Sequence, residues 1–483
     1  MANNFSDDQL IVFEDFKRFL SSDKNYMIVS GAAGTGKTTL IETLQSISLN
    51  NEWNCIPLGV WGRSSSSITQ ISGIPSITIL KYNRVFQDIK NQVINEKSFS
   101  EWYENFYKRR FSFIDTYVKP GLRFILNIIK KALELFLKKR KEFITKTVLI
   151  VDEASTLVLN DLFLAFDNTK TVSKNVKVLL LGDDCQLPPA KKSDSGANVL
   201  FDLNWIEDNT IFKTFEGVKE LKTSHRVSEG PLFELAGKLR TLASTNSSGL
   251  EARKLILDSL NNQEVIGLGK KACYANLKNI DNLTEKIFIS SETETKDVRD
   301  ELRNVYLNNP SDILVKGDFL RSRINGKKEA YVTGDEFIVN EIIDDSLDDF
   351  IIVRAEVVSR IKEFTGNPFK DVYNLFSTLF RHNKGIETKI AIYLPPLIDD
   401  DEYLKGTNII RNEVFNAWES LEKEPDVHDV VAVSYGYAVT IQHAQGGEWD
   451  TVALSLGVEP KHDTARYWYT IITRAKKQIF IVQ

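Results

Sequence analysis

The chain has 483 residues, of which 42% are hydrophobic and 26% charged, with a formal net charge of −5. This length has room for several packed domains of about 100–200 residues each, and the composition is typical of a globular protein. No apolar run approaches the roughly 18 residues that a membrane-spanning helix requires, and the N-terminus has no signal-peptide or transit-peptide pattern. We therefore expect a cytoplasmic protein without a membrane partner. Three scattered cysteines are too few for a disulfide framework or a zinc site and favour reduced thiols.

Positive charge is concentrated in one segment of the chain. The pI is near 5.8, which excludes a uniformly basic surface of the kind that many nucleic-acid-binding proteins carry. Residues 101–146, however, contain 12 Lys or Arg against five Asp or Glu. If the protein binds nucleic acid, this segment is the predicted local basic track.

The first part of the chain alternates between helix and strand. An amphipathic helix over residues 7–20 leads to a short apolar strand at 26–30, a Gly-rich turn and a new helix from Lys37. Two further apolar strands are expected at 147–153 (TVLIVDE) and 176–184 (VKVLLLGDD). This alternation predicts a parallel α/β sheet.

Residues 81–146 interrupt that rhythm and are predicted to be a mostly helical insertion, rich in aromatic and basic residues. Two interpretations are open. The insertion could border a nucleic-acid strand or the duplex ahead of it, supplying phosphate contacts and a stacking wedge. Alternatively, the aromatic residues form the core of this subdomain and the charges lie on a solvated helical face.

The second half of the chain has helical segments after about residue 226 and another apolar strand, KIFISS, at 286–291. Residues 314–358 show the period-two alternation of strands, with a turn at Asn325-Gly326, and predict a small antiparallel β module. Helix and loop are mixed over 359–428. The last 55 residues return to an α/β pattern and end in a strand, QIFIVQ.

The segment GAAGTGKT at 31–38 fits the phosphate-loop pattern G-x-x-x-x-G-K-[ST]. Its glycines let backbone N–H groups face phosphates, and the following helix presents its positive end to them. Lys37 would reach the β- and γ-phosphates, and Thr38 would offer its hydroxyl to Mg²⁺. The residues predicted to bind ATP here are Gly31, Gly34, Gly36, Lys37, Thr38 and Thr39.

The segment TVLIVDEAS at 147–155 is the expected partner of the phosphate loop. Asp152 comes at the carboxyl end of a buried strand, which is where open α/β sheets place their ligands. We expect Asp152 to hold Mg²⁺ and Glu153 to activate the attacking water. An ordinary strand followed by a capping acid is the structural alternative.

Further motifs resemble those of superfamily 1 helicases, specifically the 5′-to-3′ branch with its RecD-like and phage Dda-type enzymes. LLLGDDCQLPPA at 179–190 is similar to the third helicase motif, which implies that Gln186 senses the γ-phosphate with support from Asp183. LKTSHR (221–226) and YTIITRAKK (469–477) resemble the fourth and sixth motifs. The resemblance makes Arg226 and Arg474 candidate arginine fingers; surface salt bridging is the alternative.

Two other motifs complete the resemblance to this family. FSDDQ (5–9) is placed like the glutamine motif, which implies that Gln9 reads the adenine edge. YAVTIQHAQGGEWD (437–450) is similar to the fifth motif and implies an ATP-site role for Glu448 and a strand contact for Thr440.

The sequence also departs from the family at several motifs. Gln442-His443 replaces the usual His-Lys pair, which leaves Gln442 beside the strand, while His443 fits a packed or solvated imidazole equally well. Leu80 replaces the usual His of a T-I-H ending. The other residues that the resemblance places on nucleic acid are Arg63 and Ser64 of GRSSSS, Thr78, and Ser290 and Ser291.

The resemblance implies an α/β fold of two RecA-like lobes, each with an insertion. Lobe 1, the ATP-binding lobe, is expected over 1–80 and 147–225, lobe 2 over 226–313 and 429–483, a helical basic insertion over 81–146, and a β-rich, barrel-like insertion over 314–428.

The implied function is that of an ATP-dependent 5′-to-3′ translocase and helicase on single-stranded DNA, with ATP and Mg²⁺ as cofactors. Arginines from a second lobe would let the cleft close on ATP and reopen after hydrolysis. One alternative is an ATPase that translocates or remodels complexes without unwinding, as a subunit of a larger machine. Another is a P-loop kinase or an ATP-gated switch. RNA is a further possible substrate because no motif reads the 2′-hydroxyl. The sequence identifies no protein partner.

Overall fold

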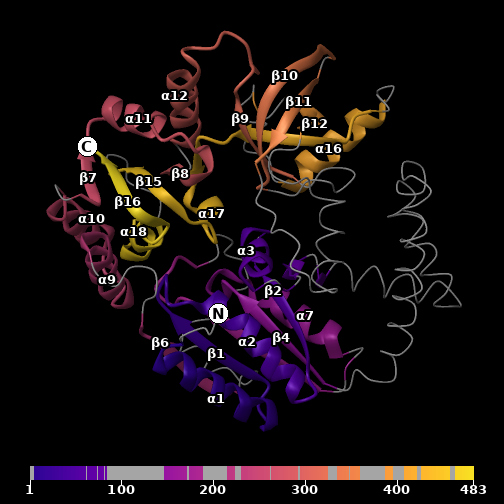
Figure 1. Ribbon diagram of the computed structural model, residues 1–483, viewed down its shortest axis with the longest axis vertical. Helices are drawn as coiled ribbons and strands as arrows, with labels where there is room; N and C mark the ends of the chain where they lie inside the picture. Colours follow the sequence, from indigo (N-terminus) through magenta and orange to yellow (C-terminus); the bar gives the residue numbers. More distant parts are fainter. Residues whose placement is uncertain are drawn as a thin grey trace, which may run out of the picture.

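The computed structural model describes residues 5–60, 62–72, 74, 76–80, 82–83, 146–170, 173, 175–188, 215–223, 230–260, 263–291, 294–324, 334–347, 349–358, 387–394, 397, 407–420, 426–456 and 463–483. Two parallel sheets, each with helices packed on its faces, lie one above the other in Figure 1, and a β-barrel adjoins the upper sheet. The mixed α/β fold with two RecA-like lobes and a barrel in the second is the fold that the sequence predicted.

The first lobe is built on a six-stranded sheet in the order β3-β2-β4-β5-β1-β6, in which every neighbouring pair is parallel. The three expected strands of this lobe are present as β1, β4 and β5. The strand bounds are β1 Tyr26–Gly31, β2 Asn54–Gly59, β3 Ile77–Thr78, β4 Lys146–Asp152, β5 Asn175–Gly182 and β6 Phe215–Leu221.

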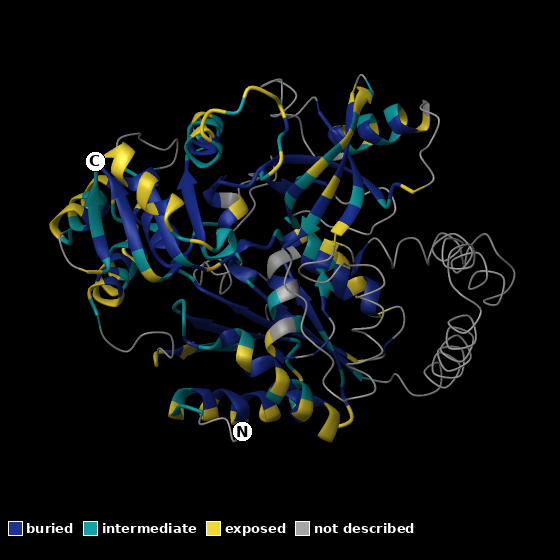
Figure 2. Ribbon diagram, turned by 45° about the horizontal axis from the view of Figure 1, so that its top comes forward, coloured by how far each residue is buried: buried dark blue, intermediate teal, exposed yellow. Residues whose placement is uncertain are grey.

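Helices cover both faces of this first sheet because its strands are apolar on both sides. Met27 and Val29 of β1 face a core with α1, α2 and α3, whereas Ile28 faces a core with α7. In Figure 2 the strands are buried and α1 carries exposed residues on its outer side. The helix bounds are α1 Asp7–Ser21, α2 Lys37–Asn50, α3 Gly62–Ser72 and α7 Leu159–Lys170.

The second lobe has a five-stranded parallel sheet in the order β14-β8-β15-β16-β7. Helices α9, α10 and α18 share a core with one face, and α11 and α12 pack on the other. The strands are β7 Val265–Leu268, β8 Lys286–Ser290, β14 Ala438–Thr440, β15 Trp449–Ser455 and β16 Ala475–Val482. The helices are α9 Pro231–Ser244, α10 Gly249–Asp258, α11 Lys270–Lys278, α12 Thr295–Leu307, α17 Ile441–Ala444 and α18 Ala465–Ile472.

The β-rich insertion is a closed barrel in the order β10-β11-β12-β13-β9. Over 314–358 the pairs β9–β10 and β10–β11 are antiparallel, as expected. The barrel also includes β13, which follows the expected insertion boundary at residue 428 and pairs with β12 in parallel. The elements are β9 Phe319–Ser322, β10 Glu336–Leu347, β11 Phe350–Val357, β12 Glu387–Tyr393, β13 Asp429–Tyr435 and the helix α16 Thr407–Ser420.

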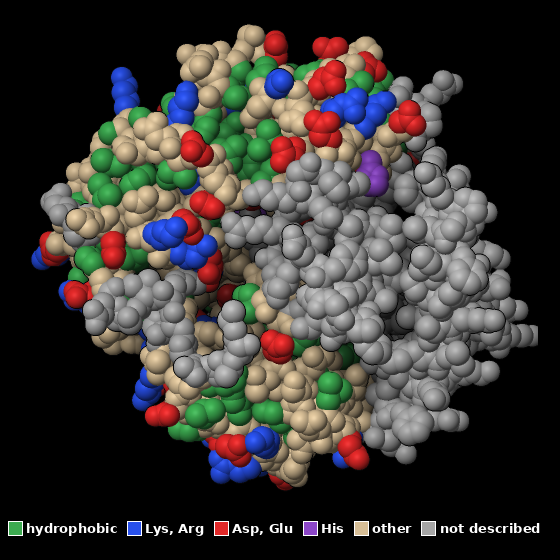
Figure 3. Space-filling view, viewed as in Figure 1, with side chains coloured by type: hydrophobic (Ala, Val, Ile, Leu, Met, Phe, Trp, Pro, Cys, Tyr) green, Lys and Arg blue, Asp and Glu red, His purple; other side chains and the backbone are tan. Residues whose placement is uncertain are grey.

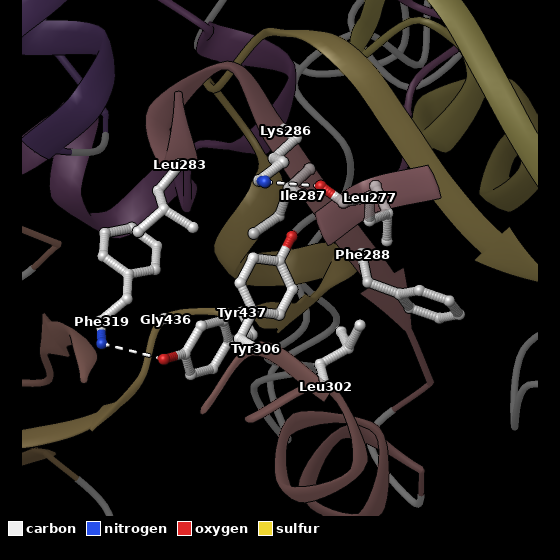
Figure 4. Close-up of a pocket in the computed structure, with 10 residues that line it drawn as sticks. All are labelled: Leu277, Leu283, Lys286, Ile287, Phe288, Leu302, Tyr306, Phe319, Gly436 and Tyr437. Atoms are coloured by element: carbon white, nitrogen blue, oxygen red, sulfur yellow. Dashed lines mark hydrogen bonds between the residues drawn. The ribbon is translucent and has the colours of Figure 1, made fainter. Parts of the chain in front are cut away.

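The barrel and the second sheet share one continuous hydrophobic core, in which Phe319 and Phe337 of the barrel join Phe288 of β8. Figure 4 shows the centre of this junction, where Lys286 and Tyr437 border a small cavity of about 10 Å³. The Phe319 N–H donates to the Tyr437 hydroxyl over 3.1 Å, and Lys286 Nζ donates to the Leu277 carbonyl over 2.5 Å. The barrel is therefore packed against the second lobe.

The expected helical insertion at 81–146 lies outside the described residues except at its two ends, and so does the expected turn at Asn325-Gly326. Within the described part of the chain, no helix has the length and apolarity to cross a membrane. All three cysteines are free and buried.

Candidate functional site: an ATP cleft between two lobes

The phosphate loop joins β1 to α2 at the carboxyl edge of the first sheet. Gly34 and Gly36 have φ values of 84° and 76°, a left-handed region that glycine adopts without steric cost. Lys37 is buried, and its Nζ donates to the carbonyls of Gly31 and Ala32 over 2.6 and 3.0 Å. The loop is thus curled around the lysine ammonium.

Gly31 has no room for a side chain. A Cβ atom there would lie 2.6 Å from Thr35 Oγ1 and 2.9 Å from Leu221 Cβ. The first glycine of the motif is therefore required by close packing against the loop and β6. Thr39, in contrast, is exposed, and its hydroxyl bonds to the Gly36 carbonyl within the first turn of α2.

The beginning of α1 contacts the phosphate loop. Gln9 is buried; its Nε2 donates to the Thr35 carbonyl over 3.1 Å, and its Oε1 accepts from the Ser6 N–H. The preceding residue, Asp8, accepts from the backbone N–H groups of Lys222 and Thr223 over 2.7 and 2.8 Å. The N-terminus of α1 therefore connects the loop to the segment that follows β6.

The predicted Mg²⁺ ligands lie next to each other. Thr38 Oγ1 donates to Asp152 Oδ2 over 2.7 Å, and the Glu153 N–H donates to Asp152 Oδ1 over 3.0 Å. Burial and the neighbouring Glu153 carboxylate raise the pKa of Asp152 to about 6, although Thr38 and Lys37 act in the opposite direction. Glu153 has a φ of 58°, an uncommon conformation for a residue other than glycine.

The loop after β5 adds two carboxylates and an amide at the same edge of the sheet. Asp183 is fully buried, and burial raises its pKa while the Lys37 ammonium partly offsets the rise. Gln186 Nε2 lies 3.5 Å from Asp183 Oδ2, and Gln186 Oε1 is buried without a hydrogen-bond partner among the described residues. Asp184 accepts from the Ser30 hydroxyl of β1 over 2.9 Å.

This loop also bonds directly to the second lobe. The Leu187 N–H donates to Thr470 Oγ1 over 2.9 Å, and the Leu187 carbonyl accepts from Gln445 Nε2 over 3.3 Å. Tyr469 Oη donates to Asp183 Oδ2 over 2.7 Å. Leu187 and its neighbours therefore connect the ATP-site edge of lobe 1 to α18 and to the residue that follows α17 in lobe 2.

Two arginines of the second lobe reinforce this contact. Arg240 of α9 lies 3.0 Å from Asp184 and 3.4 Å from Glu220, and its Nε lies 3.9 Å from Asp183 Oδ1. Arg466 of α18 donates to the Asp184 carbonyl.

Of the two expected arginine fingers, only Arg474 lies within the described residues. Arg474 is buried directly after α18, where it donates to the carbonyls of Thr470 and Gly447 and lies 3.3 Å from Thr473 Oγ1. These contacts are all within the second lobe. Arg226 lies outside the described residues.

The predicted strand contacts of lobe 1 lie near the carboxyl edge of its sheet. Thr78 pairs with Gly59 of β2, which pairs in turn with Asp152 of β4. Ser64 of α3 is buried, and its hydroxyl lies 2.7 Å from the position that a Cβ at Gly59 would take. The side chain of Arg63 lies outside the described residues.

The predicted strand contacts of lobe 2 are brought together by two adjacent strands. Ser290 and Thr440 are register partners at the ends of β8 and β14. The Ser290 hydroxyl donates to Thr295 Oγ1 over 2.9 Å, and Thr440 Oγ1 lies 2.8 Å from His443 Nδ1. The Ser291 hydroxyl donates to Glu294 over 3.2 Å.

Gln442 and Glu448 belong to the segment that follows β14. Gln442 is in α17, and its side chain lies outside the described residues. Glu448 is exposed immediately before β15.

Among the residues in these contacts that were not predicted from the sequence are Asp8, Arg240 and Tyr469. Asp8 and Tyr469 lie inside recognised motifs, so the sequence could have marked them as candidate site residues. It could not have identified the residues to which they bond. Arg240 lies in a helix that carries no motif. Its partners come from the other lobe, which the sequence order does not reveal.

Comparisons with known proteins agree with this arrangement. Residues 6–240 match the AAA domain family, and residues 435–482 match the UvrD-like helicase C-terminal domain. The chain is 20% identical over 492 residues to the RecBCD enzyme subunit RecD of Buchnera aphidicola subsp. Schizaphis graminum, covering 95% of this chain and 70% of that protein. It is also 22% identical to an uncharacterized protein of Methanocaldococcus jannaschii, covering 94% of this chain but 36% of that protein.

Solved structures resemble the fold over almost the whole chain. A Pif1 helicase from Bacteroides bound to single-stranded DNA has a TM-score of 0.50 and 15% identity, covering 99% of this chain and 92% of the other. A structure of two coordinating Pif1 helicases unwinding forked double-stranded DNA has a TM-score of 0.50 and 14% identity, with the same coverage. In its two domain matches, its RecD relative and its helicase motifs, the chain is thus similar to superfamily 1 helicases of the RecD type, and it shares its fold with the Pif1 helicases.

Proposed function

We propose that this chain hydrolyses ATP between its two lobes and uses the cycle to move 5′-to-3′ along single-stranded DNA and to unwind a duplex. The observation that carries the proposal is the bonding of Leu187, next to the ATP site of lobe 1, to Thr470 and Gln445 of lobe 2. A loop held by both lobes can transmit a change at the nucleotide to a strand that crosses them.

The residues at the cleft can divide the chemistry of hydrolysis among them. Lys37 would exchange its two loop carbonyls for oxygens of the β- and γ-phosphates. Glu153 would accept a proton from the attacking water. Arg474, next to α18, would turn toward the γ-phosphate when the cleft closes, and Arg226 is proposed as the second finger on sequence grounds.

Thr38 and Asp152 are suited to hold Mg²⁺ with the nucleotide. A hydroxyl and a carboxylate are hard oxygen ligands of the kind that this ion prefers, and their oxygens lie 2.7 Å apart. The buried carboxylate of Asp152, with a raised pKa, would be stabilised by a cation. When bound, Mg²⁺ would neutralise charge on the phosphates; Thr38 and Asp152 would hold it at the end of β4.

The single-stranded DNA would cross the two sheets near their carboxyl edges. Thr78 and Ser64 would offer contacts from lobe 1, and Ser290 and Thr440 from lobe 2. Movement from 5′ to 3′ is supported by the barrel in lobe 2, which resembles the insertion of that helicase branch. The Pif1 helicases of similar fold, one bound to single-stranded DNA and one described for unwinding at forked double-stranded DNA, support the substrate.

Two assays test this function. ATP turnover is measured with single-stranded DNA, single-stranded RNA and duplex side by side, and we expect single-stranded DNA to stimulate it most. Forks with either a 5′ or a 3′ tail are then offered, and only the 5′ tail is expected to support unwinding. Displacement of streptavidin without fork opening would instead indicate a translocase, and turnover that no strand stimulates would indicate a kinase or switch.

A further inference from the structure

Asp183 receives hydrogen bonds from both lobes. Its Oδ2 accepts from the Tyr469 hydroxyl of lobe 2, and its Oδ1 accepts from the Cys185 N–H of its own loop over 3.1 Å. Asp183 and Tyr469 are 286 residues apart in sequence, and both are buried, with exposed fractions of 0% and 1%. A hydroxyl–carboxylate bond shielded from water in this way is among the stronger kinds of hydrogen bond.

The Asp183 carboxylate also determines the orientation of the Gln186 amide. Because both Asp183 oxygens act as acceptors, only the NH₂ end of the Gln186 amide can lie against them. Gln186 Nε2 is accordingly the atom near Asp183, at 3.5 Å. Gln186 Oε1 is left buried and without a partner among the described residues. A buried acceptor without a donor is costly, and this one fits an O–H group better than it fits a phosphate oxygen.

Arg240 supplies positive charge to the same carboxylates from the second lobe. Its guanidinium lies 3.0 Å from Asp184 Oδ1 and its Nε 3.9 Å from Asp183 Oδ1. A cation in this position favours the charged, acceptor-only form of Asp183. From lobe 2, Tyr469 therefore donates a hydrogen bond to Asp183, and Arg240 adds a positive charge 3.9 Å away without a hydrogen bond to it.

We propose, on the basis of the function above, that Tyr469 and Arg240 are positioning residues that orient Gln186 through Asp183. Gln186 Oε1 then accepts one O–H of the attacking water, and the carboxylate of Glu153 accepts the other. The water oxygen forms the bond to the γ-phosphorus, the bond from that phosphorus to the bridging oxygen breaks, and the proton passes to Glu153. Contact between the lobes thereby controls whether the water is aligned, which links strand binding across both lobes to the rate of hydrolysis.

Tyr469→Phe tests this link, since it removes one hydroxyl and keeps the ring in the core of lobe 2. With an oligo-dT strand at saturation, we expect the kcat of ATP hydrolysis to fall roughly tenfold or more while KM for ATP stays within about twofold, because misalignment affects the reacting geometry and not nucleotide binding. Tyr274→Phe is the matched control. Tyr274 Oη donates to Glu301 over 2.8 Å in lobe 2, on helices α11 and α12, and its loss should leave both constants unchanged.

A second comparison separates positioning from general loosening. If Tyr469 acts through Gln186, adding Tyr469→Phe to Gln186→Ala should cause no further loss in the rate constant of ATP hydrolysis measured in single-turnover assays. Losses that multiply would overturn the proposal, and so would a Tyr469→Phe protein that behaves like the Tyr274→Phe control. Arg240→Gln should show the same split between kcat and KM, which provides the test if Tyr469→Phe does not fold. If no nucleic-acid strand stimulates ATP hydrolysis by the wild-type protein, the proposed function itself is wrong. If strands stimulate the wild type, Tyr469→Phe and Arg240→Gln equally, only the positioning role is wrong.

Discussion

The Thr38 hydroxyl donates a 2.7 Å hydrogen bond to Asp152 across 114 residues of chain, and this bond joins the phosphate-loop helix to the end of β4. The other Asp152 oxygen is held by the Glu153 N–H. The Asp152 carboxylate therefore fixes the positions of the Thr38 hydroxyl, which is suited to bind a metal with it, and of Glu153, the proposed general base. Figure 1 shows that α2 and β4 lie together beneath the second lobe, which faces the same edge of the sheet.

Glu153→Gln is expected to separate ATP binding from hydrolysis. The amide keeps the size of the side chain but cannot accept the proton of the attacking water, so ATP should bind with near-normal affinity and turnover should be lost. Lys37→Ala should instead weaken nucleotide binding, because it removes the cation next to the phosphates. Equilibrium binding of a fluorescent ATP analogue and steady-state turnover measure the two effects. A Glu153→Gln protein with wild-type turnover would show that another group acts as the base.

Arg474→Ala is expected to lower kcat by roughly 10³, the scale of a lost arginine finger, while ATP affinity changes little. Arg226→Ala should behave in the same way if the fourth motif is correctly assigned. Arg354→Ala is the matched control, because Arg354 pairs with Glu341 on the outside of the barrel at 3.1 Å and should not affect turnover. Near-normal kcat in Arg474→Ala would mean that its contacts with Thr470 and Gly447 are purely structural.

Asp8→Asn is expected to lower stability in a pH-dependent way. Burial would raise the pKa of Asp8, but its bonds with Ser6, Thr223, Lys222 and Gln9 lower the pKa to about 2, compared with the ordinary 3.8. The folded state therefore binds this proton less tightly than the unfolded state does. The stabilisation is complete above about pH 5 and is lost as the pH falls through 4 toward 2.

The measurement for Asp8 is chemical denaturation of wild type and Asp8→Asn at several pH values. The difference in unfolding free energy between them should be largest near pH 6 and should shrink by pH 3. Asp7→Asn, one residue earlier at an exposed position, is the control and should show no such trend. If the difference in unfolding free energy stays constant across this pH range, the negative charge of Asp8 does not strengthen its hydrogen bonds with the backbone N–H groups of residues 222–223.

Much of the fold was predictable because several strands of the two parallel sheets are buried on both faces and appear as continuous apolar runs. The strands β1, β4, β5 and β8 have this form, and so does the second half of β16. The sequence did not predict β6, whose residues FEGVKEL mix charged and apolar side chains, or the short strands β7 and β14. It also assigned residues 429–435 to lobe 2 rather than to the barrel, because an apolar run such as VVAVSY does not specify which strand it pairs with.

The ATP site was predictable to a greater degree than the contact between the lobes. Gly31, Lys37, Thr38, Asp152 and Glu153 lie within two short motifs, and local geometry brings them to one edge of one sheet. The bond between Asp183 and Tyr469 depends on how two separately folded lobes meet, and no local pattern encodes that. Sequence could mark each residue as part of a motif without revealing that they touch.

The last prediction concerns the basic insertion, which lies outside the described residues. On the face that Figure 3 shows, the Lys and Arg of the described residues are interspersed with Asp and Glu. A nucleic-acid strand that is held through many phosphates requires concentrated positive charge. The sequence offers Lys138, Lys139, Arg140 and Lys141. Each phosphate contact on a single strand contributes about 0.7 to the slope of log K against log salt concentration.

Neutralising these four residues to Gln should therefore weaken single-strand binding and reduce that slope by up to about 3, while kcat at saturating strand changes less. Lys270, Lys271 and Lys278, which are exposed on α11, provide the control, and their neutralisation should leave the slope unchanged. Binding is measured by fluorescence anisotropy of a labelled oligo-dT between about 50 and 200 mM salt. If the quadruple variant keeps the wild-type slope and opens forks normally, the insertion is not on the strand's path and its charges form a solvated face or a surface for another partner.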